Sequence, residues 1–221
     1  MGRHARIPRT YRGRDVFAWL QAIGQLDVHA DDVPDLAAAR RAPSLPLSGA
    51  GGGESLGLDR LAALGVVVTG RLSHFSEGHA HFAQDLHRRL RDADRRQRRI
   101  LAQIDEHIER AGVAAEPAQL PAPLVLPHGP AAVEAGAAVR TVLWATGYRR
   151  AYPWLDVPVL DGAGELVHRE GVTAVPGLFA LGLRFQRTRK SHMLGGVGDD
   201  AAHLADLILA RSGDAAAAQA A

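Results

Sequence analysis

The sequence has 221 residues, of which 47% are hydrophobic and 23% are charged. This length suits one large domain or two small ones, and the hydrophobic content is ordinary for a protein with a buried core. The 26 lysines and arginines are nearly balanced by 24 acidic residues, so the formal net charge is only +2. The high pI of about 9.5 therefore reflects arginine's high pKa, and the composition gives little support to nucleic-acid binding.

The absence of cysteine excludes disulfides, thiolate metal sites and a redox-active cysteine pair within these residues. No stretch reaches the roughly 18 apolar residues that a membrane-spanning helix needs. No apolar signal-peptide region follows residues 1–4 either. We therefore expect a cytoplasmic protein without a membrane segment.

The first elements are a basic loop and a short helix. The order Arg12-Gly13-Arg14-Asp15 predicts a turn with Asp15 as N-cap of a helix over residues 15–26. Residues 27–47 are rich in Asp, Ala, Arg and Pro and indicate a loop with at most one helical turn.

A helix and two strands are predicted next. Residues 56–64 have helical spacing that ends at Gly65, and the β-branched residues 66–69 predict a strand. A second short strand contains His79 and His81, which share one face of it. No third ligand follows at useful spacing, so we predict no metal site there.

Residues 84–111 form the longest predicted helix. Its apolar stripe consists of Leu86, Leu90, Ala93, Gln97, Ile100, Ile104 and Ile108, and its opposite face is rich in arginine. The pairs Asp92–Arg96 and Asp94–Arg98 have the favourable i,i+4 order, each contributing only ~0.3 kcal/mol. We interpret the arginine face as the solvated side of a packed helix; a basic patch for an acidic partner is the alternative. The Pro- and Ala-rich residues 114–130 then indicate a linker.

Three glycine-containing blocks follow. In residues 141–149, Thr-Val-Leu-Trp-Ala-Thr-Gly-Tyr-Arg, the apolar start predicts a buried strand that ends in a turn. Residues 175–183 repeat this design with a Pro-Gly turn, a short apolar strand and a glycine. Residues 194–200 lead into a last helix at 201–209 with Asp in its first turn. Between the first two blocks, an Asp-Gly turn within residues 154–167 predicts a hairpin.

The order Ala-Thr-Gly-Tyr, Pro-Gly-Leu-Phe-Ala-Leu-Gly and Gly-Gly-Val-Gly-Asp resembles the carboxyl-terminal part of the two-dinucleotide-binding flavoproteins. It is most similar to their flavin-containing monooxygenase branch, which includes bacterial members labelled as flavoproteins of potassium transport. Residues 2–20 are similar to the stretch after the second strand of the NADPH domain in that branch. The resemblance implies an FAD- and NADPH-dependent oxidoreductase.

The fold that the resemblance implies is α/β, a partial Rossmann-like FAD/NAD(P)-binding fold truncated at its N-terminus. Residues 1–140 would be the remainder of the NAD(P)H-binding domain, with the long helix 84–111 inserted. Residues 141–213 would be the carboxyl-terminal part of the FAD-binding domain. Residues 214–221, an Ala-rich tail, are expected to be disordered.

The resemblance also implies a set of cofactor-binding residues, and it assigns no catalytic residue. Arg3 and His4 would lie near the NADPH 2′-phosphate, which suits the geometry of an arginine fork. The remaining members are Ala145, Thr146, Gly147 and Tyr148, where the two cofactor domains would meet, and Gly182, Leu183, Gly195, Gly196 and Val197, near the flavin. The cationic residues 186–191 face either the flavin pocket or solvent.

The sequence departs from this family in one respect. The family seats its two pyrophosphates on G-x-G-x-x-G turns, and neither turn is present. The Gly-rich run 49–54 follows Pro43 and Pro46, so it reads as a loop. We therefore expect an incomplete chain, with a non-catalytic remnant or an arginine-rich binding module as the alternative.

The missing pyrophosphate cradles give a first prediction. Purified on its own, the chain should be colourless and should not oxidise NADPH, because nothing in it seats either pyrophosphate. Absorbance of the purified protein and an NADPH oxidation assay check this. Yellow protein with one FAD per chain would contradict it.

Overall fold

The computed structural model describes residues 6–42, 45, 47, 57–136 and 139–219, the side chains of 212–219 excepted. The chain divides into two compact units. Unit 1 comprises residues 1–23 and 42–146, and unit 2 comprises residues 24–41 and 147–221. Both units are therefore built from two separate stretches of sequence. The Gly-rich run 49–54 lies outside the described residues.

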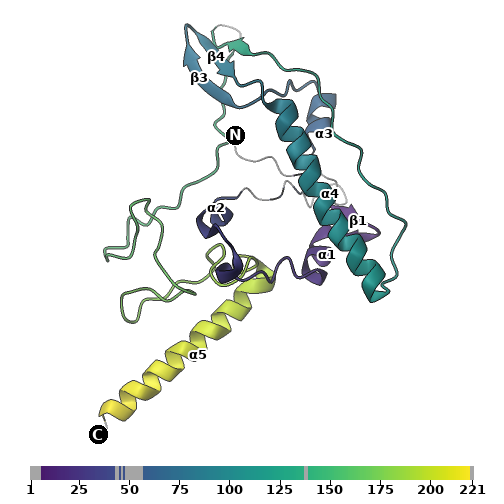
Figure 1. The fold of residues 1–221 in the computed structure, drawn as a ribbon. Coiled ribbons are helices and arrows are strands. Elements are labelled where there is room, and N and C mark those ends of the chain that lie inside the picture. The colour runs from purple at the N-terminus through teal and green to yellow at the C-terminus, as the bar shows by residue number, and fades with distance from the viewer. Residues whose placement is uncertain (1–5, 43–44, 46, 48–56, 137–138, 220–221) are drawn as a thin grey trace. The chain divides into compact units, whose positions relative to one another are not determined.

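The long helix α4, Leu86–Ala111, is the main element of unit 1 (Figure 1). Its apolar stripe is buried, with Leu90 and Ile104 inside and Ile100 half-buried, so the predicted continuous helix is confirmed. Leu101 is fully buried as well, although it lies beside the predicted stripe. The helix ends at Gly112, whose φ of 62° is left-handed and whose N–H donates to the carbonyl of Ile108.

The amino-terminal segment of unit 1 packs against α4. Strands β1 (Thr10–Tyr11) and β2 (Arg14–Asp15) form a small antiparallel hairpin, which confirms the predicted turn. Helix α1, Val16–Ala22, follows, and the Asp15 side chain accepts from the Phe17 N–H at 2.8 Å as predicted for an N-cap. The core cluster of this region consists of Tyr11, Trp19, Leu101, Ile104 and Ile108.

Two acidic residues of α4 bind the amino-terminal segment. Asp94 is buried, with Arg6 Nη1 at 2.5 Å and the Leu124 N–H at 3.1 Å. The predicted pairing of Asp94 with Arg98 is therefore wrong, because the carboxylate turns inward, where a buried charge needs partners. Asp105 accepts from the Tyr11 hydroxyl at 2.8 Å. Burial first, and then this hydrogen bond, raise the pKa of Tyr11 to about 12.

The other described residues of unit 1 include one short helix and one small sheet. Helix α3, Leu58–Ala63, ends next to Gly65, whose φ of 85° makes it the predicted stop. Strands β3 (Leu72–Ser76), β4 (His79–Phe82) and β5 (Ala132–Glu134) form an antiparallel sheet in the order β3-β4-β5. This confirms the predicted strand containing His79 and His81.

Two predicted strands of unit 1 are absent from the structure. Residues 66–69 and 142–144 carry no strand, and Val67 and Leu143 are exposed. β-branched and aromatic residues favour strands only where a partner strand and a burying surface exist. Neither segment forms a ladder with another described strand, and only Val68 of residues 66–68 packs against the core, beside Leu86, Leu90 and Leu126.

Unit 2 is held together by pairing between two distant segments. The Ala30 N–H donates to the Arg187 carbonyl at 2.7 Å, the Arg189 N–H to Val28 at 3.0 Å, and the Lys190 N–H to Leu26 at 3.1 Å. The 3-10 turn Ala30–Asp32 and helix α2, Leu36–Arg40, follow in the first segment. This region is therefore more helical than the loop that the sequence predicts.

The second and third glycine blocks differ from their predicted structures. Residues 175–183 contain only an isolated bridge, Val172 to Phe179, in place of a strand. The hairpin around Asp161 is present as the bridge between Leu160 and Leu166. Helix α5, Leu194–Gln219, begins earlier than predicted, so its first turn contains no acidic residue. It continues to Gln219.

The described residues thus form a mixed α/β structure with small antiparallel sheets. The α/β class is confirmed. The Rossmann-like arrangement, which needs a parallel sheet, is not found among the strands of the described residues. Also among them, no helix is both long and apolar enough to cross a membrane.

The buried face of α4 gives a second prediction. Leu101→Ala should lower the free energy of unfolding by about 2–5 kcal/mol, because the side chain is fully buried and its removal leaves a cavity. Leu120→Ala is the control, since Leu120 is exposed and should change stability by less than about 0.5 kcal/mol. Urea unfolding of both variants measures the difference. Equal values would contradict the packing described for α4.

Candidate functional site

The first glycine block is exposed. Ala145, Thr146, Gly147 and Tyr148 all lie at the surface, and the division between the units falls between Thr146 and Gly147. The motif thus contributes its first two residues to unit 1 and its last two to unit 2. Arg3 and His4 lie outside the described residues.

The glycines of the three blocks differ in what surrounds them. Gly147 and Gly182 have φ of 85° and 82°, and a Cβ on either would meet nothing within 4 Å. Both backbones are therefore strained for other residues and open to close approach by a ligand. Gly195 is open in the same way. A Cβ on Gly196 would lie 2.3 Å from the Lys190 carbonyl oxygen, so internal packing accounts for this glycine.

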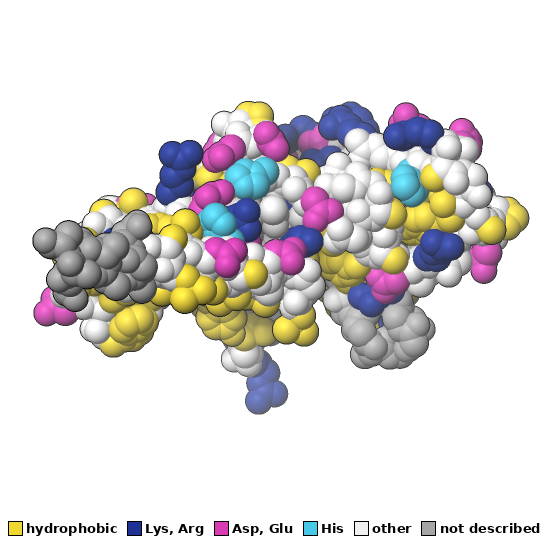
Figure 2. Space-filling model, turned by 90° about the horizontal axis from the view of Figure 1, so that it is seen from below, with side chains coloured by type: hydrophobic (Ala, Val, Ile, Leu, Met, Phe, Trp, Pro, Cys, Tyr) yellow, Lys and Arg dark blue, Asp and Glu magenta, His cyan; other side chains and the backbone are white. Residues whose placement is uncertain are grey.

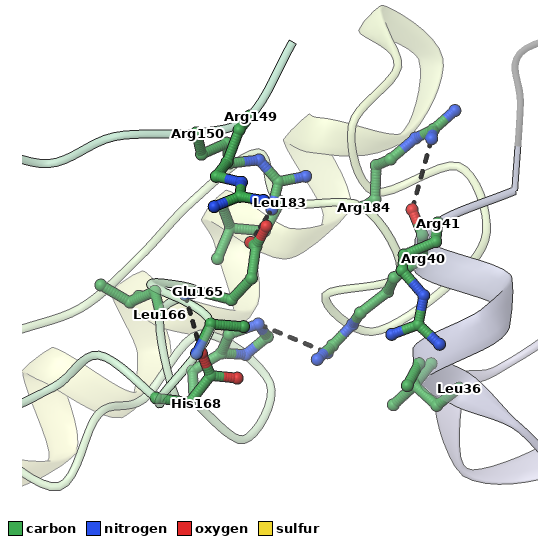
Figure 3. A pocket seen from close by; sticks show the side chains of 13 residues that line it. Leu36, Arg40, Arg41, Arg149, Arg150, Glu165, Leu166, His168, Leu183 and Arg184 are labelled. Carbon is green, nitrogen blue, oxygen red and sulfur yellow. Dashed lines mark hydrogen bonds and ion pairs between the residues drawn. The ribbon is translucent and has the colours of Figure 1, made fainter. Parts of the chain in front are cut away.

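A pocket of 560 Å³ lies within unit 2 (Figure 3). Helix α2 supplies one wall, and loops of the second segment supply the others. Its lining residues are Leu36, Ala37, Arg40, Arg41, Arg149, Arg150, Asp161, Ala163, Glu165, Leu166, His168, Leu183 and Arg184. Leu183 is thus the one predicted cofactor residue that borders the pocket, and Arg149 directly follows the predicted Tyr148. Val197 lies in the first turn of α5 and does not line it.

The pocket has an excess of positive charge. Five arginines line it against two carboxylates, Asp161 and Glu165. Glu165 pairs with Arg150 at 2.8 Å. Asp161 accepts from the N–H groups of Ala163 and Glu165, both at 2.9 Å, so it stabilises its own turn. Arg41 and Arg149 have no ion-pair partner among the described residues. The pocket therefore favours an anionic ligand.

Arg40 crosses from α2 toward His168 (Figure 3). One Nη donates to the Phe185 carbonyl at 3.1 Å, while its Nε is buried without a hydrogen-bond partner among the described residues. Burial first, and then Arg150, lower the pKa of Arg40 below its ordinary value, and Glu165 opposes them. An arginine keeps its charge even so, and a buried N–H without an acceptor is costly.

The His168 side chain lies opposite the Arg40 guanidinium in the pocket. Its Nδ1 accepts from the Gly171 N–H at 3.2 Å, so a neutral ring carries its proton on Nε2. Burial first, and then Arg40 and Arg150, lower the pKa of His168 and favour that neutral ring. Its Nε2 lies 3.4 Å from an Nη of Arg40. Two donors therefore face each other, and an acceptor oxygen beside the pair, about 2.9 Å from each nitrogen, would satisfy both.

A second polar cluster in unit 2 connects α5 to the first segment. Glu170 lies 3.4 Å from both His29 and His203 and 3.7 Å from Arg187. Residues 186–191 include the buried Gln186 and Ser191, so this segment packs inside unit 2. No group of three or more His, Asp or Glu in the described part of the chain is arranged to hold a metal ion.

The arginines of α4 are partly neutralised. Arg89 pairs with Asp85 at 2.6 Å, Arg110 with Glu106 at 3.5 Å, and Arg95 with Asp92. Figure 2 shows acidic and basic side chains interspersed over one face of the molecule as a whole. Such pairs favour the solvated-face interpretation of this helix over a dedicated basic patch.

Part of the chain is homologous to curated oxidoreductases. It is 49% identical over 72 residues to the protein named uncharacterized oxidoreductase CzcO-like from Geobacillus kaustophilus. This match covers 32% of this chain and 21% of that protein. It is 42% identical over 67 residues to the uncharacterized oxidoreductases CzcO of Bacillus velezensis and Bacillus subtilis, with 30% of this chain and 19% of theirs covered. The matched part thus spans about a fifth of these relatives. No family model and no solved structure gives a significant match.

The depressed pKa of His168 gives a third prediction. A histidine whose folded-state pKa lies below 6.5 contributes stability above that pH and loses it as the pH falls through the lower value. His168→Gln, which keeps an acceptor for Gly171, should therefore flatten the fall of the melting temperature between about pH 7 and pH 5. His79→Gln, at an exposed histidine, is the control and should follow the wild type. If the melting temperatures of His168→Gln and the wild type had the same pH dependence, the neutral, half-buried state described for His168 would be contradicted.

Proposed function

We propose that this chain is part of an FAD-dependent NADPH oxidoreductase of the monooxygenase-like kind. The 49% identity over 72 residues to a protein named an oxidoreductase carries the proposal. The three glycine blocks support its finer part, because their resemblance to flavin-containing monooxygenases implies FAD and NADPH. The proposed activity is that of a whole protein of the relatives' length, because the match covers only about a fifth of each relative.

The chain's own residues would bind and orient the cofactors. Gly147, Gly182 and Gly195 have open space where a side chain would stand, which fits close approach of a cofactor to the backbone. At Gly196 the space where a Cβ would stand is filled by Lys190, so packing already explains the glycine there. NADPH would supply a hydride, and FAD would accept it and react with oxygen.

The other proposed contacts follow the resemblance. Arg3 and His4 would bind the NADPH 2′-phosphate, because an arginine fork matches phosphate oxygens. Ala145, Thr146 and Tyr148 would border the cofactors beside Gly147, and Leu183 and Val197 would border the flavin. These groups position cofactors, and no side chain among them is proposed as a proton donor.

A fusion of residues 1–221 with the part of the Bacillus subtilis relative that lies outside the match tests the proposal. A folded fusion should be yellow with bound FAD and should oxidise NADPH. A folded fusion that stays colourless would contradict the proposal and favour a non-catalytic remnant. Circular dichroism of the fusion establishes that it is folded.

A fourth prediction concerns Gly147 in this fusion. Gly147→Val should weaken FAD or NADPH binding at least tenfold, about 1.4 kcal/mol, because the side chain would occupy the ligand's space. Gly177→Val is the matched control, since Gly177 has a similar φ of 83° and equally open surroundings but no proposed contact. The backbone strain that valine introduces should be similar in both variants. Equal cofactor affinity with equally lowered melting temperatures would remove Gly147 from the site.

A further inference from the structure

We propose that the arginine-lined pocket of unit 2 binds a phosphorylated small molecule of about nucleotide size, with a phosphate oxygen accepting hydrogen bonds from Arg40 and His168. The inference stands apart from the FAD and NADPH assignment, because it rests on the pocket's side chains alone. It names a ligand class for a pocket that the resemblance reaches only at Leu183, and it rests on Arg40 and His168, to which the resemblance assigns no role.

Unsatisfied donors carry the proposal. Arg40 Nε is buried without an acceptor among the described residues, and an Nη of the same side chain lies 3.4 Å from His168 Nε2. Because His168 Nδ1 already accepts from Gly171, the neutral ring offers only its Nε2–H on the other side. An anionic oxygen accepts from both groups at once and removes the conflict between two donors.

The charge of the pocket selects a phosphate over a neutral acceptor. Its lining has an excess of three positive charges, and Arg149 and Arg41 have no ion-pair partner among the described residues. A guanidinium group donates two parallel hydrogen bonds to two phosphate oxygens. The charge of a phosphate dianion also matches this excess better than the charge of a single carboxylate does. A cation would be repelled.

The size and the apolar lining select a ligand larger than free phosphate. A volume of 560 Å³ lies within the range of roughly 300–1,000 Å³ typical of small-molecule sites. Leu36, Leu166 and Leu183 line the same pocket and provide apolar surface for the rest of the ligand. A phosphate attached to an uncharged, partly apolar group fits both kinds of wall.

Calorimetric titration of the full chain with inorganic pyrophosphate at low salt tests the site. The wild type should bind, and Arg40→Met and Arg149→Met should each weaken binding about tenfold or more, because each removes a charge-assisted contact. Arg110→Met removes the same charge from the exposed end of α4 and should bind as the wild type does. Glu165→Gln should strengthen binding, because it frees Arg150.

The opposite signs of these effects separate a binding role from a structural one. Arg149 is exposed and has no ion pair among the described residues, so its variant should keep the fold even if Arg40→Met does not. Circular dichroism and melting curves check each variant. No pyrophosphate binding at millimolar concentration by the wild type would overturn the proposal, and so would unchanged affinity in Arg149→Met and Glu165→Gln.

Competition identifies the source of the phosphate. AMP, FAD and NADPH are each added to the pyrophosphate-loaded chain. Displacement by AMP alone supports a mononucleotide-sized ligand, and displacement by FAD or NADPH supports a dinucleotide phosphate. Failure of all three to compete would overturn the nucleotide-sized ligand. A colourless fusion protein would count against the proposed oxidoreductase and leave this binding result unaffected.

Discussion

Half-buried arginine side chains determine the character of unit 2. Arg40, Arg187 and Arg189 each have an Nε that is buried without a hydrogen-bond partner among the described residues. Burial lowers the pKa of Arg189 as it does that of Arg40. A charge removed from water is costly unless acceptors surround it, so the carbonyl of Phe185 and the carboxylates of Glu170 and Asp200 set where these side chains can lie. The buried polar residues of the unit, Gln186, Ser191 and Asp200, lie where these arginines need acceptors.

Unit 1 depends on the packing of apolar side chains against α4, and it is the part that the sequence predicts best. The stripe of α4 repeats at helical spacing over more than twenty residues, so local pattern alone identifies both the helix and its buried face. The Asp15 cap and the stop at Gly65 are also local signals. Residues 66–69 and 142–144 fail as strands because a strand requires a partner, and no local pattern shows whether one exists.

The pocket escapes prediction for the same reason. Arg40, Arg150, His168 and Arg184 come from four separate stretches, and each alone is indistinguishable from a solvated surface residue. The pair Arg149-Arg150 directly after Ala-Thr-Gly-Tyr is the one signal that the sequence offers. The first two glycine blocks border this pocket through Arg149 and Leu183, whereas Gly196 in the third block is accounted for by packing on Lys190.

The pairing between the two stretches of unit 2 bears on how the protein folds as it is made. Arg40 and the carbonyl of Phe185 that it binds are 145 residues apart in sequence. At a synthesis rate of roughly 5–20 residues per second, the partners of residues 24–41 are made about 7 to 30 seconds after them. Unit 1 also closes a loop, of 94 residues between Tyr11 and Asp105, but unit 2 closes one of 145 residues and is expected to be the slower step. During that interval the arginines of α2 remain hydrated on the nascent chain, and they lose water only when the carboxyl-terminal stretch arrives.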